Sequence, residues 1–156
     1  MKKEDYLIET KAGILRMKIS EDGKGICEII FSDEYAEDQS PLLKHAVTEL
    51  KEYFGGERKI FDFPLSMKGT EFQHRVWNIL RQIPFGETVS YGQVAEMAGN
   101  KKACRAVGMA NHRNRILIAV PCHRVTAADG SPGGYAFGTD IKQKLIDFER
   151  GRIRLL

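Results

Sequence analysis

The sequence predicts an α+β fold, in which a small N-terminal antiparallel sheet with one helix precedes a mostly helical, winged-helix-like C-terminal domain containing a helix-turn-helix. Strand-like alternation is confined to the first 31 residues, and helical apolar spacing dominates after residue 69. The chain has 156 residues, of which 42% are hydrophobic, so it can bury a core without disulfides or metals. We expect two domains, residues 1–68 and 69–156.

Three strands and one helix are predicted in the N-terminal part. The strand-like runs cover residues 5–10, 13–20 and 26–31. Asp22-Gly23 lies between the last two runs and is a hairpin signal. After an acidic segment, 32–40, which we expect to be a solvated loop, apolar residues at helical spacing run from Pro41 to Phe54 and end at two glycines.

The C-terminal part is predicted to be helical after a short connector. Residues 59–65 are extended but contain Pro64, which suits an edge strand or an irregular connection. Capping boxes predict two helix starts, at Thr70 with Gln73 and at Ser90 with Gln93. The first helix should end before Pro84 and contribute Trp77 to the core. The second should stop at Gly99, and 101–114 should form another short helix, so that the two make a helix-turn-helix, although such pairs also occur in proteins that bind no nucleic acid.

The remaining elements surround a cysteine. An apolar, strand-like run at 116–120 leads into Pro121-Cys122-His123-Arg124, and a glycine-rich loop follows at 131–138. Asp140 and Gln143 suggest a capping box for a last helix that Gly151 closes.

Charge is distributed unevenly along the chain. The formal net charge is +3, but residues 1–70 carry −3 and residues 71–156 carry +6. Between Glu96 and Asp129 there is no acidic residue, whereas six basic residues occur there: Lys101, Lys102, Arg105, Arg113, Arg115 and Arg124. This segment is a candidate surface for a polyanion such as nucleic acid.

Cysteine usage and hydropathy predict a reducing compartment. The three cysteines are widely spaced and odd in number, which argues against a disulfide framework. No signal-peptide pattern and no apolar run long enough to cross a bilayer occurs in the sequence. We therefore expect a cytoplasmic protein without a membrane partner, or a nuclear or nucleoid-associated one.

Cys122 is the candidate nucleophile. Thiolate is the reactive form, and His123 and Arg124 could supply the base or the positive field that favours it. A carboxylate should orient the imidazole, and both Asp147 and Glu149 on the last helix are candidates. Two alternatives remain at this point: a buried, inert Cys122, and a metal site made of Cys104, His112, Cys122 and His123, whose spacing fits no standard zinc pattern.

These motifs resemble one family of DNA repair proteins. PCHRV at 121–125, VSYGQVA at 89–95 and RAVGMANHRN at 105–114 are similar to segments of the O6-alkylguanine-DNA alkyltransferases, also called methylated-DNA-protein-cysteine methyltransferases. The resemblance covers residues 70–149, and the N-terminal part is compatible in length with the variable N-terminal domain of that family.

The resemblance implies a suicide transfer without a cofactor or metal. An O6-alkylguanine would be flipped out of duplex DNA, approached from the minor groove, and Cys122 would take the alkyl group irreversibly in a single turnover. Glu149, rather than Asp147, would hold His123, which takes the thiol proton through a water. Tyr91 would donate to the leaving guanine, and Asn114 would tie the recognition helix to the active-site segment.

The resemblance also implies a DNA-binding face on a protein that we expect to be a monomer. Arg105 would enter the base stack where the nucleotide has left. The other residues expected to meet DNA are Ala106, Lys101, Lys102, Arg113, Arg124 and Tyr135. The loop GGYAFG departs from the Arg-Trp that many bacterial relatives carry after the tyrosine, and the zinc ligands of some relatives are missing from the N-terminal half.

Three rival functions follow from the same residues. A helix-turn-helix DNA-binding protein would use Arg105 but not the Cys122 thiol. A lesion sensor without alkyl transfer would not need the acceptor cysteine. A Cys-His hydrolase would turn over repeatedly without DNA.

Overall fold

The computed structural model describes residues 1–10 and 13–156, with side chains described for 1–2 and 16–156. It divides into two compact units. The first comprises Met1–Met67, Arg115–Leu117 and Arg154–Leu156, and the second comprises Lys68–Asn114 and Ile118–Ile153. The α+β class expected from the sequence is confirmed.

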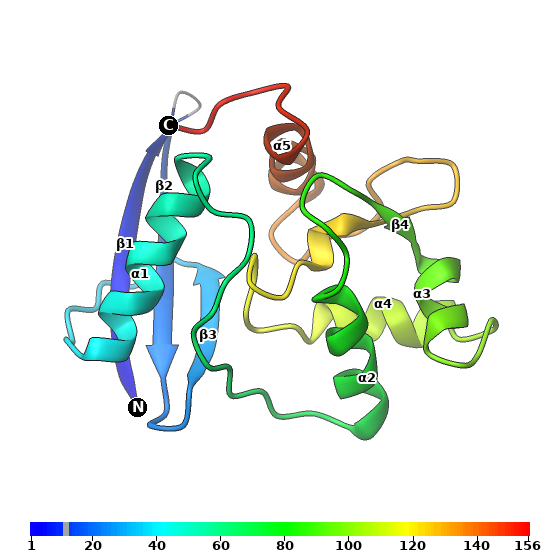
Figure 1. Ribbon diagram of the computed structural model, residues 1–156, viewed down its shortest axis with the longest axis horizontal. Coiled ribbons are helices and arrows are strands. Elements are labelled where there is room, and N and C mark those ends of the chain that lie inside the picture. Colours follow the sequence, from blue (N-terminus) through cyan, green and yellow to red (C-terminus); the bar gives the residue numbers. More distant parts are fainter. Residues whose placement is uncertain (11–12) are drawn as a thin grey trace. The chain divides into compact units, whose positions relative to one another are not determined.

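The first unit is a three-stranded antiparallel sheet with one helix packed on it (Figure 1). Its elements are β1 (Lys2–Thr10), β2 (Gly13–Glu21), β3 (Ile26–Phe31) and α1 (Pro41–Phe54). The predicted hairpin is present: the Asp22 backbone amide donates to the Gly25 carbonyl, and Gly23 adopts a φ of 86°. Ser40 caps α1 by accepting from the Leu43 amide, and Pro41 occupies the first turn, where its missing N–H is harmless.

The second unit holds the predicted helix-turn-helix. Its elements are α2 (Glu71–Leu80), β4 (Val89–Ser90), α3 (Tyr91–Met97), α4 (Cys104–His112), the 3₁₀ turn η1 (Cys122–Arg124), β5 (Val125–Thr126) and α5 (Thr139–Glu149). Both predicted capping boxes are formed, at Thr70 with Gln73 and at Ser90 with Gln93. Trp77 is buried as expected, and its indole Nε1 donates to the Ala110 carbonyl at 2.8 Å, which joins α2 to α4.

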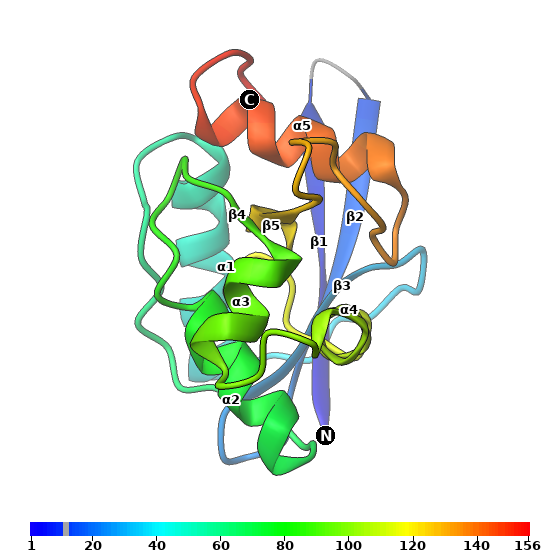
Figure 2. The same ribbon diagram turned by 90° about the vertical axis from the view of Figure 1, so that its right-hand side faces the viewer.

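The short parallel pair formed by β4 and β5 positions the site, and the sequence analysis did not predict it (Figure 2). Val89 pairs with Val125 and Ser90 with Thr126. Because α3 begins immediately after β4 and η1 ends immediately before β5, this pairing brings the first turn of α3 beside the segment that carries Cys122.

Two local predictions are wrong. The run 116–120 is buried but is not a strand: only Ile116 bridges to β3, and Ile118 adopts a φ of 72°, which turns the chain away from an extended course. The last helix has no capping box, because it begins at Thr139 after Gly138, so Asp140 lies inside the first turn. Gln143 instead donates to Asp147 one turn later.

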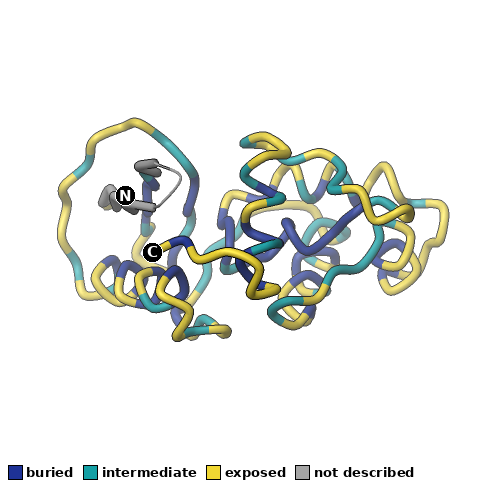
Figure 3. Tube along the Cα trace, turned by 90° about the horizontal axis from the view of Figure 1, so that it is seen from above, coloured by how far each residue is buried: buried dark blue, intermediate teal, exposed yellow. Residues whose placement is uncertain are grey.

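Each unit has its own apolar core, and buried chain lies toward the interior of each unit in Figure 3. Buried side chains of the first unit include Met17, Ile19, Ile29, Leu43, Leu50 and Tyr53, and those of the second include Val76, Leu80, Val94, Val107, Val120 and Leu145. Within the described residues, the helices are all too short or too polar to cross a bilayer.

Candidate active site

Cys122 lies at the start of η1 and is almost fully buried, with 4% of its surface exposed. Burial raises the pKa of the thiol, and a hydrogen bond from Asn114 and the positive charge of Lys142 only partly oppose this effect. The Asn114 Nδ2 also donates to the Val120 carbonyl at 2.8 Å, which ties the end of the helix-turn-helix to the segment just before the cysteine. The thiol is therefore protonated at rest and needs a base to become a nucleophile.

His123, the residue after Cys122 in the chain, forms a buried pair with Glu149. The His123 Nε2 lies 2.7 Å from the Glu149 Oε2. Burial raises the pKa of the Glu149 carboxyl, but hydrogen bonds and charge from His123 and Arg124 outweigh it and hold this pKa well below its usual range. An ionised carboxylate only accepts hydrogen bonds, so the Nε2 of His123 carries the proton.

The other imidazole nitrogen is the candidate base. Burial lowers the pKa of His123, and the Glu149 interactions that raise it do not compensate fully, so the ring is neutral near pH 7. With its proton on Nε2, the neutral ring has its lone pair on Nδ1. This atom is buried and has no hydrogen-bond partner within the described part of the chain. It can accept a proton.

Arg124 was expected to contact DNA, and the structure contradicts this prediction. Its guanidinium is buried, with Nε donating to the Glu149 Oε1 at 2.8 Å and Nη1 donating to the Ile83 carbonyl at 2.7 Å. Local basic charge indicated a phosphate contact, but it carries no information about burial. Arg124 belongs to the core of the site.

Tyr91 and Lys142 contact one another and the backbone of the glycine-rich loop. Tyr91 is the first residue of α3, and its hydroxyl lies 3.5 Å from the Gly134 carbonyl. The Lys142 Nζ, on α5, donates to the same carbonyl at 3.1 Å and lies 3.4 Å from the Tyr91 hydroxyl. Burial raises the pKa of Tyr91, and a negative charge on Cys122 would raise it further.

Lys142 was not among the site residues predicted from the sequence. It is fully buried, and burial lowers its pKa to about 8, with Cys122 acting in the opposite direction. Lysines are rarely buried, so composition gave no reason to select it. Its spacing could have done so, because Lys142 precedes Glu149 by seven residues and therefore lies on the same face of α5.

The glycine-rich loop packs closely against Tyr91. Gly133 has a φ of 71°, and a Cβ added there would lie 2.9 Å from the Tyr91 hydroxyl, so the close approach requires glycine. Tyr135 follows in the loop. Its hydroxyl is buried without a hydrogen-bond partner in the described part of the molecule, and burial raises its pKa well above the usual value.

The remaining predicted DNA contacts lie on the surface of the helix-turn-helix. Lys101 and Lys102 occupy the turn between α3 and α4, Arg105 and Ala106 are in the first turn of α4, and Arg113 follows its end. All five are exposed. Met109, which the sequence analysis did not select, is also exposed on α4.

Asp147, the other candidate orienting carboxylate, interacts elsewhere. It accepts hydrogen bonds from Gln143 and Arg152 and is not paired with His123. Glu149 is the carboxylate that contacts the imidazole.

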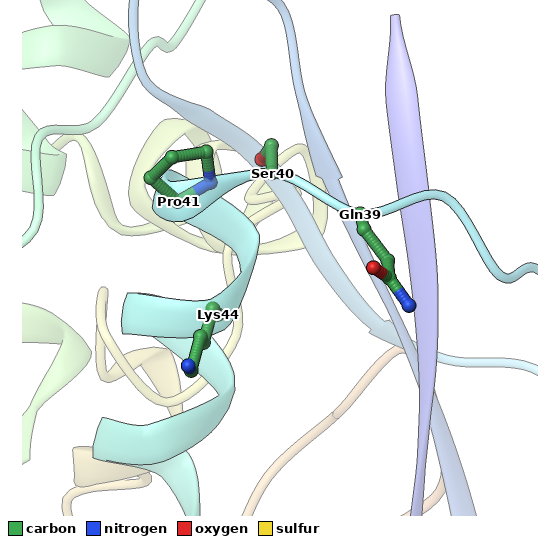
Figure 4. A pocket seen from close by; sticks show the side chains of 4 residues that line it. All are labelled: Gln39, Ser40, Pro41 and Lys44. Atoms are coloured by element: carbon green, nitrogen blue, oxygen red, sulfur yellow. The ribbon is translucent and has the colours of Figure 1, made fainter.

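Among side chains that the structure describes, one group could offer three metal ligands, and it lies in the first unit: His45, Glu49 and Asp62. The His45 Nε2 lies 2.7 Å from a carboxylate oxygen of each acid, so the group is already an ion-pair cluster. Cys104, His112, Cys122 and His123, the alternative zinc ligands, do not form such a group in the described part of the chain. A pocket lined by Gln39, Ser40, Pro41 and Lys44 at the start of α1 contains none of the predicted site residues (Figure 4).

Comparison with known proteins identifies the family. The model of the 6-O-methylguanine DNA methyltransferase DNA binding domain matches residues 71–151, and that of the ribonuclease-like domain of the same proteins matches residues 7–67. A methylated-DNA–protein-cysteine methyltransferase of Methanosarcina acetivorans is 50% identical over 126 residues, covering 81% of this chain and 80% of the relative. The constitutive Bacillus subtilis protein of that name is 45% identical over 149 residues, covering 94% and 89%.

Solved structures agree. The structure of Mycobacterium tuberculosis OGT in complex with DNA superposes with a TM-score of 0.83 at 37% identity, covering 97% of this chain and 95% of that one. The family models together match most of the chain, and the curated relatives match along most of their own length. The chain therefore belongs to the 6-O-methylguanine DNA methyltransferase family.

Proposed function

We propose that this protein repairs O6-alkylguanine in duplex DNA by transferring the alkyl group to the Sγ of Cys122. The observation that carries the proposal is a buried Cys122 thiol followed directly in the chain by a neutral His123, whose Nε2 is held by an ionised Glu149. The relatives are named methylated-DNA–protein-cysteine methyltransferases, and the related M. tuberculosis protein has been solved with DNA.

The transfer is a single displacement. The His123 Nδ1 takes the thiol proton, directly or through one water, and the thiolate attacks the alkyl carbon. The new bond joins Sγ to that carbon, and the bond from the carbon to the guanine O6 breaks. The electron pair of the broken bond stays on the guanine, which gains a proton, so the net result is S-alkylcysteine and unmodified guanine.

Tyr91 and Lys142 stabilise the departing base in this proposal. The Tyr91 hydroxyl donates to the guanine as negative charge develops on it, and the Lys142 ammonium, 3.4 Å away, favours the loss of that phenolic proton. The same ammonium lowers the pKa of the Cys122 thiol. Lys142 thus acts on both the nucleophile and the leaving group.

Binding is assigned to the exposed basic surface. Lys101, Lys102 and Arg113 contact phosphates, and Arg105 fills the gap left by the flipped nucleotide. The exposed Ala106 and its neighbour Gly108 are small enough for close approach to a minor groove. The loop carrying Tyr135 covers the flipped base.

The remaining expectations belong to this proposal as well. Residues 69–156 carry DNA binding and alkyl acceptance, and residues 1–68 form a separate domain. The protein acts as a monomer in the cytoplasm or on the nucleoid, and it needs no cofactor because it is itself the acceptor.

The test is a titration of the protein with an excess of duplex containing O6-methylguanine. We expect the amount of lesion removed to equal the amount of protein, and Cys122→Ser to bind the duplex without removing any. Continued turnover would support a hydrolase. If the wild type and Cys122→Ser bind the duplex equally and neither removes the lesion, the protein is a DNA-binding or lesion-sensing protein.

A further inference from the structure

We propose that Arg124 is a positioning residue that shares the Glu149 carboxylate with His123 and thereby keeps the imidazole neutral, with Nδ1 available as the base. The inference deepens the proposed function and rests on it. It also gives a role to a residue that the sequence had placed on the DNA-binding surface.

The geometry is a fork around one carboxylate. The Arg124 Nε donates to the Glu149 Oε1 at 2.8 Å, and Nη2 donates to Oε2 at 3.0 Å. Oε2 is also the oxygen that faces the His123 Nε2 at 2.7 Å. The carboxylate therefore has a permanent cation on one side and a titratable imidazole on the other.

Arg124 is itself fixed by a separate segment. Its Nη1 donates to the Ile83 carbonyl at 2.7 Å, and its guanidinium lies 5.8 Å from the centre of the Phe85 ring. The Gly86 amide donates to the Glu149 Oε1 at 3.3 Å. The loop between α2 and β4 thus holds both the guanidinium and the carboxylate, so the fork is rigid.

The charges around His123 show why sharing matters. Glu149 on α5 favours the imidazolium, whereas Arg124 in η1, Lys142 on α5 and burial itself all favour the neutral ring. The Cys122 thiol and the Tyr135 hydroxyl are uncharged at neutral pH, because their pKa values are raised. Without Arg124, a buried carboxylate would have His123 as its remaining cationic hydrogen-bond partner, and a protonated ring cannot accept the thiol proton.

The direct test is titration of His123 by NMR with labelled histidine. The chain has four histidines, so the signal is assigned with His123→Gln. In the wild-type protein we expect Nδ1 to be unprotonated at pH 7, and an imidazolium there would overturn the proposal without any Arg124 variant. In Arg124→Gln, which keeps a donor but removes the charge, we expect the pKa of His123 to rise by about one unit or more.

Matched variants separate charge from structure. Arg124→Lys keeps the charge, so the pKa of His123 in this variant should be close to the wild-type value. Arg81 is exposed and near Ile83 in sequence, and Arg81→Gln should leave the pKa of His123 unchanged. In a Glu149→Gln background, Arg124→Gln should raise the pKa of His123 by less than it does in the wild-type background, because only the direct repulsion between Arg124 and the imidazolium is then lost. An unchanged pKa in Arg124→Gln, or equal shifts in the Lys and Gln variants, would refute charge sharing. Arg124→Met provides a second neutral variant if the Gln variant does not fold.

Transfer kinetics give an independent readout. In Arg124→Gln, the acid limb of the profile of transfer rate against pH should shift to higher pH. The rate should therefore fall about tenfold on the acid side and recover at higher pH. A phosphate contact would instead weaken DNA binding and reduce its salt dependence at every pH. If the wild-type protein transfers no alkyl group, the proposed function fails, whereas the titration still decides the role of Arg124.

Discussion

The burial of Lys142 lowers the stability of the folded state, and the proposed reaction gives a reason for its position. A lysine with no exposed surface and a pKa lowered to about 8 destabilises the folded state, because burial opposes its charge. Its amine contacts the Gly134 carbonyl and the Tyr91 hydroxyl, and neither partner is an anion. In the proposed mechanism, the loss of stability is the cost of a positive charge that acts on Cys122 and Tyr91.

Replacing Lys142 by Met should therefore stabilise the protein and disable it. We expect the free energy of unfolding at pH 7 to rise by on the order of 1–3 kcal/mol and the transfer rate to fall at least about tenfold. The pKa of Lys142 in the folded protein lies below that of a lysine in the unfolded chain. At pH values between these two pKa values the unfolded state binds more protons, so the free energy of unfolding of the wild type should rise relative to that of the variant from about pH 8 to 10. Urea unfolding at several pH values measures this difference. A variant less stable than wild type at pH 7 would contradict the account.

Local sequence indicates the proposed nucleophile and base but not the groups around them. Cys122 and His123 are consecutive, so chemistry alone suggests that they act together. Reactivity rules left both Glu149 and Asp147 as candidates on the last helix. The family resemblance favoured Glu149, and in the structure Glu149 is the carboxylate that contacts the imidazole. Arg124 was wrongly expected to contact phosphates, since a basic residue in a basic segment gives no sign that it is buried.

At the scale of elements, helix starts were the most predictable features. Side-chain caps depend on residues three apart, so Thr70 with Gln73 and Ser90 with Gln93 could be found in the sequence, and both are formed. The parallel pairing of β4 with β5 depends on residues 36 positions apart and leaves no local pattern. The positive φ of Ile118 also goes against local preference, so the turn before Cys122 could not be predicted.

The glycine-rich loop yields a prediction at this scale. Gly133→Ala should push the Tyr91 hydroxyl out of place, because the added Cβ would approach it to 2.9 Å and a φ of 71° is unfavourable for alanine. We expect slower alkyl transfer with DNA affinity unchanged. Gly134→Ala is the matched control, because no atom lies within 4 Å of its added Cβ and its carbonyl is retained. Equal rates in the two variants, measured in single-turnover assays, would contradict the role given to this loop.

For the whole molecule, the distribution of charge is more informative than its sum. The net charge of +3 is small, but the segment between Glu96 and Asp129 has no acidic residue and includes the turn and second helix of the helix-turn-helix. Of its six basic residues, Arg124 is buried and Arg115 pairs with Glu28 within the first unit. The other four basic residues of this segment, Lys101, Lys102, Arg105 and Arg113, are exposed and lie on or beside the helix-turn-helix.

This distribution predicts the salt dependence of DNA binding. Replacing Lys101 and Lys102 together by Ala should weaken binding to unmodified and alkylated duplexes alike. The slope of log affinity against log salt should decrease in magnitude by about 2, as expected for two lost phosphate contacts. Lys144→Ala, an exposed lysine on α5, serves as the control and should leave the slope unchanged. Fluorescence anisotropy at several salt concentrations measures the slopes, and an unchanged slope in the double variant would place the DNA on another surface.

Transfer of the alkyl group to Cys122 can be measured by mass spectrometry of the protein after incubation with duplex containing O6-methylguanine. We expect one added methyl group per chain, located by peptide mapping on Cys122, with Cys27 and Cys104 unmodified. No added mass while the lesion disappears, or a methyl group on another residue, would contradict this expectation.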